Sequence, residues 1–200
     1  MSRKAIFGGT FDPVHNGHIY LANKALDFLN LDKVIFVPAG NPPLKTKKTV
    51  TEGKIRLEMI EKAIGHNDKF QVDAFEIHNK AVSYTYKTLQ YFKNLEKSTK
   101  WFFLVGTDCL YEFHLWKNVD IILDLCQVVV FSRPGYNQQE IFEKKKEAEE
   151  KYNKEIIFLD VMDMDISSSG IREKIKSKEN IEALIPKPVM EIIDENQLYR

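Results

Sequence analysis

Two histidines, His15 and His18, follow Gly8, Gly9 and Thr10 near the start of the chain. The residues after them predict a helix, and a spacing of three on its first turn places two imidazoles on one face. The first turn of a helix also carries backbone N–H groups without a helical partner and the positive end of the helix dipole. Glycines lack a Cβ, so a ligand can approach their main chain. Together these features predict a cradle for phosphate groups.

A strand before these residues and a helix after them must hold them in place. Ala5–Phe7 is an apolar run that predicts a buried strand, and Pro13 prevents the strand from continuing. The apolar spacing of Ile19–Leu29 predicts the helix. Each histidine alone is more often a helix cap or a solvated residue, and the His-x-x-His spacing, with Asp12, also suits half of a zinc site. The glycines and the preceding strand favour phosphate.

A second polar group lies near the carboxyl end, where Ser167, Ser168 and Ser169 precede a helical pattern with Arg172 in its first turn. One serine is enough to cap a helix, and capping is the simpler interpretation. Three hydroxyls, a helix N-terminus and an arginine together predict a second anion site.

Strand-like runs alternate with stretches of helical period. Central runs such as Val34–Val37 and Val128–Phe131 are apolar throughout, as is typical of parallel strands covered by helices on both faces. We predict an α/β fold with a Rossmann-like, doubly wound parallel sheet and a small C-terminal helical segment. The predicted strands are Lys4–Phe7, Lys33–Pro38, Trp101–Val105, Gln127–Phe131 and Glu155–Leu159, with an irregular edge strand at Phe70–Ile77 whose Asp73 and Glu76 point outward. The predicted helices are Ile19–Leu29, Thr51–Ile64, Thr85–Leu95, Val119–Leu125 and Gln138–Tyr152.

Loops with glycine or proline follow four of these strands. The carboxyl ends of parallel strands meet at one edge of a sheet, so we expect a single ligand crevice there. Gly106 and Asp108 follow one strand, and Asp108 is placed either to accept ribose hydroxyls or to cap the next helix. Lys45, in a basic loop, and Arg133, after another strand, are candidates for binding phosphate.

The composition narrows the possible partners. Lys and Arg number 29, as do Asp and Glu, so we expect no nucleic-acid partner and an anionic ligand held by local charge. No apolar run has the length of a membrane span and no signal peptide is visible, so we expect no membrane partner and a cytoplasmic location. Cys109 and Cys126 are expected to be reduced thiols. The 200 residues predict a single domain, 1–200, with a helical subregion at about 166–200.

Residues 8–18, Gly-Gly-Thr-Phe-Asp-Pro-Val-His-Asn-Gly-His, resemble the signature of the His-x-Gly-His nucleotidyltransferases, in the form found in bacterial nicotinate mononucleotide adenylyltransferases. Segments Gly106–Trp116, Ile166–Arg172 and Ile185–Tyr199 resemble further motifs of that family in the same order. The chain departs from the family at Leu44, where a histidine is usual, and at Lys87, where an acidic or amide residue is common.

The residues and the resemblance together assign two sets of binding residues. The set expected to bind ATP is Gly8, Gly9, Thr10, His15, His18, Lys45, Gly106, Asp108, Ile166, Ser167, Ser168 and Arg172. The set expected to bind the second substrate is Tyr84, Thr85, Trp116 and Arg133. In this set the resemblance implies that Trp116 is a stacking surface for the nicotinate ring, and Thr85 is also expected to cap a helix.

The implied reaction joins nicotinate mononucleotide and ATP into nicotinate adenine dinucleotide and pyrophosphate, in NAD biosynthesis. The 5′-phosphate would attack the α-phosphorus of ATP in line with the leaving group. His15, His18, Thr10 and Arg172 are the expected catalytic residues, because they can donate to phosphate oxygens as charge develops. Mg²⁺ is expected on substrate phosphates and water rather than in a protein cage.

Other functions remain open on the sequence. Pantetheine-phosphate adenylyltransferases and cytidylyltransferases share the first motif. A nucleotide-binding module without catalysis would use the same residues, and a metal-dependent hydrolase would use Asp12 with the two histidines. The preference for nicotinate over nicotinamide mononucleotide and the oligomeric state are not fixed, and a homo-oligomer is one possibility.

Overall fold

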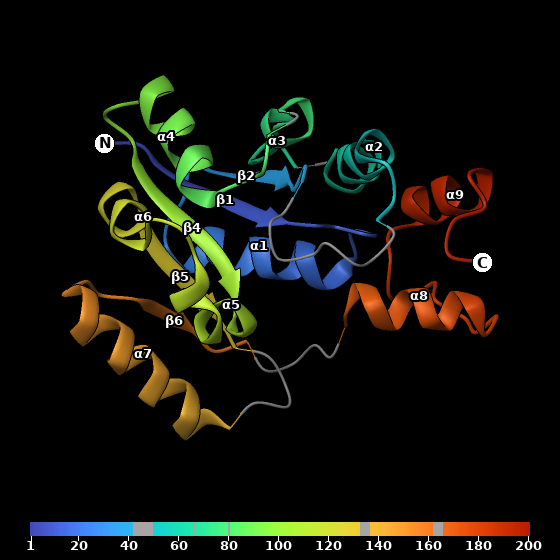
Figure 1. The fold of residues 1–200 in the computed structure, drawn as a ribbon. Helices are drawn as coiled ribbons and strands as arrows, with labels where there is room; N and C mark the ends of the chain where they lie inside the picture. The colour runs from blue at the N-terminus through green and yellow to red at the C-terminus, as the bar shows by residue number, and fades with distance from the viewer. Residues whose placement is uncertain (42–49, 66, 80, 133–136, 162–165) are drawn as a thin grey trace.

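A computed structural model of the chain describes residues 1–41, 50–65, 67–79, 81–132, 137–161 and 166–200 (Figure 1). At its centre, parallel strands lie in the order β3-β2-β1-β4-β5-β6. The strands are β1 Arg3–Gly9, β2 Lys33–Pro38, β3 Phe70–Val72, β4 Lys100–Gly106, β5 Gln127–Phe131 and β6 Ile157–Leu159. This is the strand order of the Rossmann fold, so the predicted doubly wound sheet is confirmed.

Helices follow most strands. They are α1 Asn16–Phe28, α2 Gly53–Ile64, α3 Phe75–His78, α4 Thr85–Leu95, α5 Thr107–Tyr111, α6 Val119–Leu125, α7 Gln138–Tyr152, α8 Ser168–Lys176 and α9 Lys187–Glu195, with a short 3₁₀ helix, η1, at Phe113–Leu115. The five helices predicted from the sequence are all present, although α1 begins three residues earlier than predicted.

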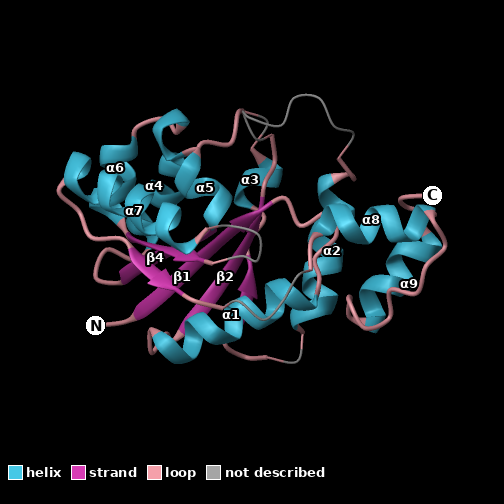
Figure 2. Cartoon of the chain, turned by 90° about the horizontal axis from the view of Figure 1, so that it is seen from below, coloured by secondary structure: helices cyan, strands magenta, loops and turns pink. Residues whose placement is uncertain are grey.

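Successive strand residues point to opposite faces of the sheet, and each face has its own apolar core. Ala5, Phe7 and Phe36 belong to a cluster that includes residues of α1, α2, α8 and α9. Ile6 and Ile35 belong to a second cluster with residues of α4, α5, α6 and α7. Helices therefore cover both faces, as Figure 2 shows from below. The central strands are apolar at every position because both faces of the sheet are buried under helices.

The C-terminal helices α8 and α9 lie beyond the ends of the strand arrows in Figure 1. Val189, Ile192 and Ile193 of α9 are buried in the same cluster as Met59 and Ile60 of α2. The end of the chain is thereby fixed beside the carboxyl edge of the sheet.

The predicted edge strand at Phe70–Ile77 is wrong in its second half. The strand ends at Val72, and the Asp73 carboxylate accepts the Phe75 N–H at 2.8 Å, a turn that starts α3. Glu76 consequently points inward, where its carboxylate accepts the Thr88 hydroxyl at 2.6 Å. The predicted strand Glu155–Leu159 is shorter, since β6 begins at Ile157.

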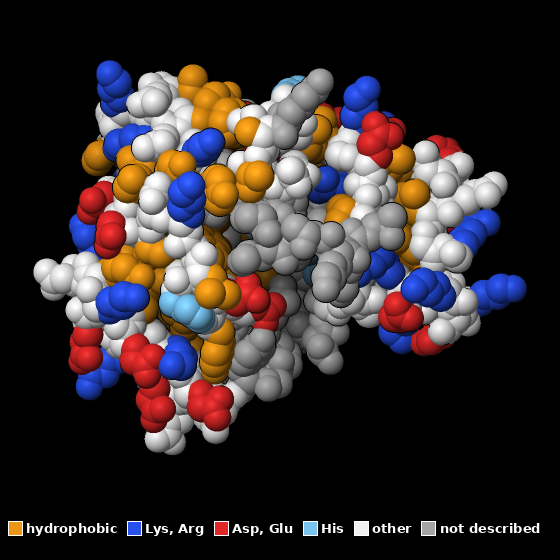
Figure 3. Space-filling view, in the orientation of Figure 1, with side chains coloured by type: hydrophobic (Ala, Val, Ile, Leu, Met, Phe, Trp, Pro, Cys, Tyr) orange, Lys and Arg blue, Asp and Glu red, His pale blue; other side chains and the backbone are white. Residues whose placement is uncertain are grey.

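Three general features accompany this fold. Charged side chains of both signs are interspersed on the face drawn in Figure 3, in keeping with the balanced composition. Cys109 and Cys126 are free thiols. Across the described ranges, no helix has both the length and the apolar character needed to cross a membrane.

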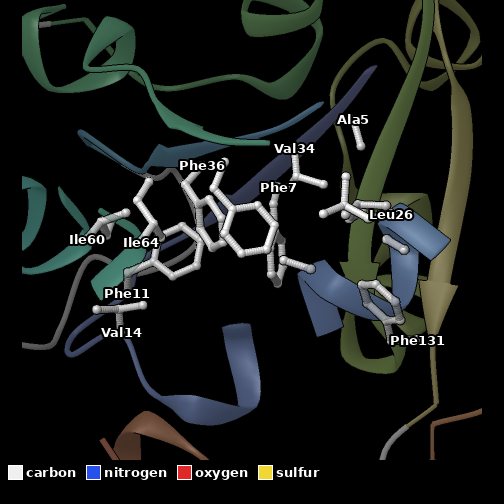
Figure 4. Close-up of a cluster of buried hydrophobic side chains, with 14 of the residues drawn as sticks. Ala5, Phe7, Phe11, Val14, Leu26, Val34, Phe36, Ile60, Ile64 and Phe131 are labelled. Carbon is white, nitrogen blue, oxygen red and sulfur yellow. The ribbon is translucent and has the colours of Figure 1, made fainter. Parts of the chain in front are cut away.

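A substitution of Phe36 in β2 tests the packing of the aromatic rings in the first apolar cluster. Its ring is fully buried, and its centroid lies 5.4 Å from Phe7, 5.7 Å from Phe11 and 5.5 Å from Phe70; Figure 4 shows it beside Phe7 and Phe11. Phe36→Ala should lower the free energy of unfolding in urea by about 3–5 kcal/mol, because it removes apolar contacts and leaves a cavity. The matched Phe28→Ala, at a 66% exposed position, should change it by about 0.5 kcal/mol or less. Equal effects of the two variants would contradict this packing.

Candidate active site

The two histidines lie at the start of α1 with their rings stacked. Their ring centroids are 3.6 Å apart, at an interplanar angle of 28°, and both residues are buried. The backbone N–H of His15 donates to Nδ1 of His18 at 3.2 Å. A nitrogen that accepts a hydrogen bond carries no proton, so Nε2 is the N–H donor of the neutral His18 ring. The predicted pairing of the imidazoles on one face is confirmed.

Two aromatic rings pack against the His18 imidazole. Its centroid lies 4.9 Å from that of Phe11 and 5.9 Å from that of Phe7. Both phenylalanines belong to the first apolar cluster. The ring is therefore fixed by packing as well as by its hydrogen bond, which is the preorganisation that a catalytic donor requires.

The glycines are required by the packing of the protein itself. A Cβ on Gly9 would lie 2.9 Å from the Phe11 ring, and one on Gly8 would lie 3.2 Å from the Phe103 ring. In the sequence these glycines suggested open main chain for a ligand, but aromatic rings fill the space that their side chains would occupy. A Cβ on Gly17 would likewise meet His15 at 3.0 Å.

Part of the expected N–H supply at the start of α1 is already used. The Asn16 N–H donates to the Leu184 carbonyl at 2.9 Å, and the His18 N–H donates to the His15 carbonyl at 2.9 Å. The backbone N–H groups of Asn16 and His18 therefore already have partners within the protein, contrary to the expectation that the donors of this turn serve a ligand. The imidazoles carry more of the proposed anion binding than the backbone does.

The serine and arginine of the second motif contact the first motif directly. The Ser168 hydroxyl donates to the Pro13 carbonyl at 2.9 Å, and Arg172 Nη1 donates to the Asp12 carbonyl at 2.6 Å. Ile166 also lies against the start of α1, with its Cβ 3.5 Å from where a Cβ of Gly17 would be. Segments more than 150 residues apart in the chain thus form one site.

Ser167 has the simpler of its two predicted roles. It is the N-cap of α8, and its hydroxyl accepts the Gly170 N–H at 3.1 Å. Its capping function is confirmed, and Ser168 and Arg172 are the side chains of this motif that contact the histidine loop.

Arg56 of helix α2 is a residue beside the site that the sequence analysis did not select. It is 2% exposed, and its guanidinium donates to the carbonyls of Thr10 at 2.7 Å, Ala39 at 2.8 Å and Thr51 at 2.8 Å. Burial lowers the pKa of Arg56 from its usual value, and the charge of Asp12 opposes that change. An arginine on the apolar face of a predicted helix was the available signal.

Two of the expected second-substrate residues, Tyr84 and Trp116, lie close to each other. Trp116 is half-buried, and its ring lies 6.0 Å from that of Phe103, the ring that faces Gly8. The adjacent Lys117 places Nζ 4.8 Å from the Tyr84 ring centroid. Tyr84 and Trp116 therefore lie on neighbouring segments near the ends of β1 and β4.

The prediction that Thr85 caps helix α4 is wrong. Thr85 is the first residue of α4, and Tyr84 is its N-cap without a side-chain hydrogen bond. Ser83 instead accepts the Asn41 N–H at 3.1 Å. Burial raises the pKa of the nearby Glu76 carboxyl, while hydrogen bonds from Thr88, Ser83 and the Gly40 backbone oppose this.

Of the remaining predicted site residues, Gly106 and Asp108 are described by the structure. Gly106 ends β4, and Asp108 lies exposed in the first turn of α5, near the adjoining strand ends. Its neighbour Thr107, which the sequence analysis did not select, is fully buried and donates to the Phe131 carbonyl at 2.8 Å, which joins β4 to β5. Lys45 and Arg133 lie outside the described residues.

A model of the cytidylyltransferase-like family matches residues 6–174. The chain belongs to this family. A "probable nicotinate-nucleotide adenylyltransferase" of Clostridium novyi is 48% identical over 200 residues, which cover all of both chains, and one of Clostridium tetani is equally similar over the same share. These full-length similarities confirm the resemblance of the motifs.

Solved structures share the fold at lower identity. A Plasmodium falciparum nicotinic acid mononucleotide adenylyltransferase complexed with NaAD superposes with a TM-score of 0.81 at 19% identity, covering 100% of this chain and 98% of that one. The same enzyme complexed with APC gives a TM-score of 0.78 at the same identity and coverage. At this identity the comparison establishes the Rossmann-like architecture.

The chemistry of the donors suits phosphate better than a bare cation. Imidazole N–H groups and the guanidinium of Arg172 donate hydrogen bonds. In the part of the chain that the structure describes, no group of three His, Cys, Asp or Glu residues is placed to hold a metal ion.

Proposed function

We propose that this protein is a nicotinate-nucleotide adenylyltransferase that joins nicotinate mononucleotide and ATP into nicotinate adenine dinucleotide and pyrophosphate, a step of NAD biosynthesis. The observation that carries the proposal is the contact of the Ser168–Arg172 segment with the loop that holds His15 and His18. Full-length relatives with this activity in their names support it.

In the proposed reaction, a 5′-phosphate oxygen of the mononucleotide forms a bond to the α-phosphorus of ATP. The bond from that phosphorus to the bridging oxygen of the β-phosphate breaks, and pyrophosphate leaves with its electron pair. His18, through Nε2–H, and His15 donate to phosphate oxygens as charge develops on them, and Thr10 borders the α-phosphate. Arg172 holds the outer phosphates through guanidinium N–H groups other than the one bound to Asp12, and Ser168, whose one proton goes to the Pro13 carbonyl, fixes the loop beside them. Positioning and charge stabilisation account for the catalysis without a protein nucleophile.

Mg²⁺ is the metal that we propose for this reaction. When bound, it neutralises charge on the triphosphate, and it retains waters and phosphate oxygens as ligands. The guanidinium of Arg172 would orient the phosphates that carry the metal.

Gly106 and Asp108 are proposed to border the ribose of ATP, with Lys45 on its phosphates. Tyr84, Thr85, Trp116 and Arg133 are proposed for the mononucleotide, with the Trp116 indole against the nicotinate ring. Lys117 beside Tyr84 adds a positive charge on the side from which an anionic substrate would enter. A pantetheine phosphate has no aromatic ring for Trp116 to stack on, which favours the pyridine nucleotide.

We also propose that residues 1–200 act as one nucleotidyltransferase domain, in the cytoplasm, on small-molecule substrates. Support for a single domain comes from the first apolar cluster, which contains residues from Ala5 to Ile193. The oligomeric state, with a homo-oligomer as one possibility, stays a prediction.

Pyrophosphate release from ATP and Mg²⁺ with a panel of acceptors tests the proposed function. Nicotinate mononucleotide should give the highest kcat/KM, followed by nicotinamide mononucleotide, with pantetheine phosphate inactive. Release that is equal for all acceptors would contradict the proposal, and so would tight ATP binding without release. Stoichiometric zinc in the purified protein, with hydrolysis of ATP alone, would favour the hydrolase.

His18→Ala should lower kcat by about 10²–10³, because it removes a fixed donor to the developing charge. The matched control is His78→Ala, which changes an exposed histidine of α3 and should leave kcat unchanged. Circular dichroism should show both variants folded. A turnover number for His18→Ala equal to that of the wild type would remove the catalytic role of this imidazole.

A further inference from the structure

Asp12 is a buried carboxylate that the proposed reaction does not use. It is 5% exposed, and a buried carboxylate is stable only when it is hydrogen-bonded. Its Oδ1 accepts the Tyr199 hydroxyl at 2.6 Å, and its Oδ2 accepts the Thr51 backbone N–H at 3.4 Å. The penultimate residue of the chain thus reaches the loop of the first motif.

Tyr199 is itself held firmly. Its hydroxyl accepts the Thr51 hydroxyl at 3.2 Å, and its ring packs against the first apolar cluster. Burial raises the pKa of Tyr199, with a further contribution from its hydrogen bond to Asp12, so the hydroxyl keeps its proton and donates it. Its φ of 62° lies in the left-handed region, which is uncommon for a bulky residue and indicates that these contacts determine its conformation.

The main chain of the same loop is fixed by three other donors. Arg56 binds the Thr10 carbonyl, Arg172 binds the Asp12 carbonyl, and Ser168 binds the Pro13 carbonyl. Tyr199 differs from these donors because it holds the Asp12 side chain. Arg172 holds the carbonyl of Asp12 and Tyr199 holds its carboxylate, and together these two hydrogen bonds restrain rotation of the residue.

The position of Asp12 affects the imidazoles through a short path. His15 follows Asp12 by three residues, and its backbone N–H donates to Nδ1 of His18. A rotation of Asp12 would therefore move the atom that orients the His18 ring. Misplacement of a catalytic group by about 1 Å can cost on the order of 10²-fold in rate.

We propose that Tyr199 is a positioning residue, whose hydroxyl holds the Asp12 carboxylate and so keeps His15 and His18 in the geometry for phosphate. The proposal rests on the function proposed above for these imidazoles. It extends the active site to a residue far along the chain, whose hydroxyl is hydrogen-bonded to Asp12 and Thr51.

Tyr199→Phe removes only the hydroxyl and tests the proposal. At a temperature where circular dichroism shows a folded variant, kcat should fall roughly tenfold to a hundredfold, with a smaller change in the KM of ATP. The Cε1–H NMR resonances of His15 and His18, measured without substrate, should shift. The double variant Tyr199→Phe with Asp12→Asn should lose no more activity than Asp12→Asn alone, because both substitutions break the same link.

Tyr152→Phe in α7 is the matched control, and it should change neither kcat nor these resonances. Unshifted imidazole resonances in Tyr199→Phe would overturn the proposal, whether or not kcat falls, and additive losses in the double variant would also overturn it. The resonances need no substrate, so a wild-type protein that releases no pyrophosphate would refute the proposed function and still leave this proposal decided by NMR.

Discussion

The site depends on two hydrogen bonds that join the loop after β1 to the start of α8, more than 150 residues further along the chain. Arg172 and Ser168, from the start of α8, donate to the carbonyls of Asp12 and Pro13 in the loop after β1. These carbonyls belong to a turn that has left the sheet and cannot be satisfied by strand pairing, so donors must come from elsewhere. The same contacts bring the second polar motif beside the histidines. One set of bonds therefore satisfies the carbonyls of the turn and brings together the residues proposed to bind an anion.

The sheet makes this arrangement possible. Strand order reverses between β1 and β4, and at such a switch point the helices that follow diverge and leave a crevice at the carboxyl ends. The imidazoles lie on the side of the sheet covered by α1, whereas Trp116 follows β4 and packs with the opposite core. The residues proposed for the two substrates thus come from opposite sides of one sheet, with the Phe103 ring close to both Gly8 and Trp116.

The sequence predicted the architecture well because long apolar strands and glycine-bearing strand ends are local signals. It predicted the convergence of His18 and Arg172 only through the family resemblance, since no local pattern encodes a contact across the chain. The inward turn of Glu76 was missed because the Asp73 turn ends the strand early. Tyr199 was missed because its partner is a distant carboxylate, which has no signature in sequence, whereas Arg56 could have been found as an arginine on the apolar face of a predicted helix.

A crystal structure with a non-hydrolysable ATP analogue tests the central claim most directly. If the account is correct, Nε2 of His18 and the free donors of Arg172 will lie within hydrogen-bonding distance of oxygens of the same triphosphate. A triphosphate bound by one of these groups, with the other turned to a separate surface, would contradict it.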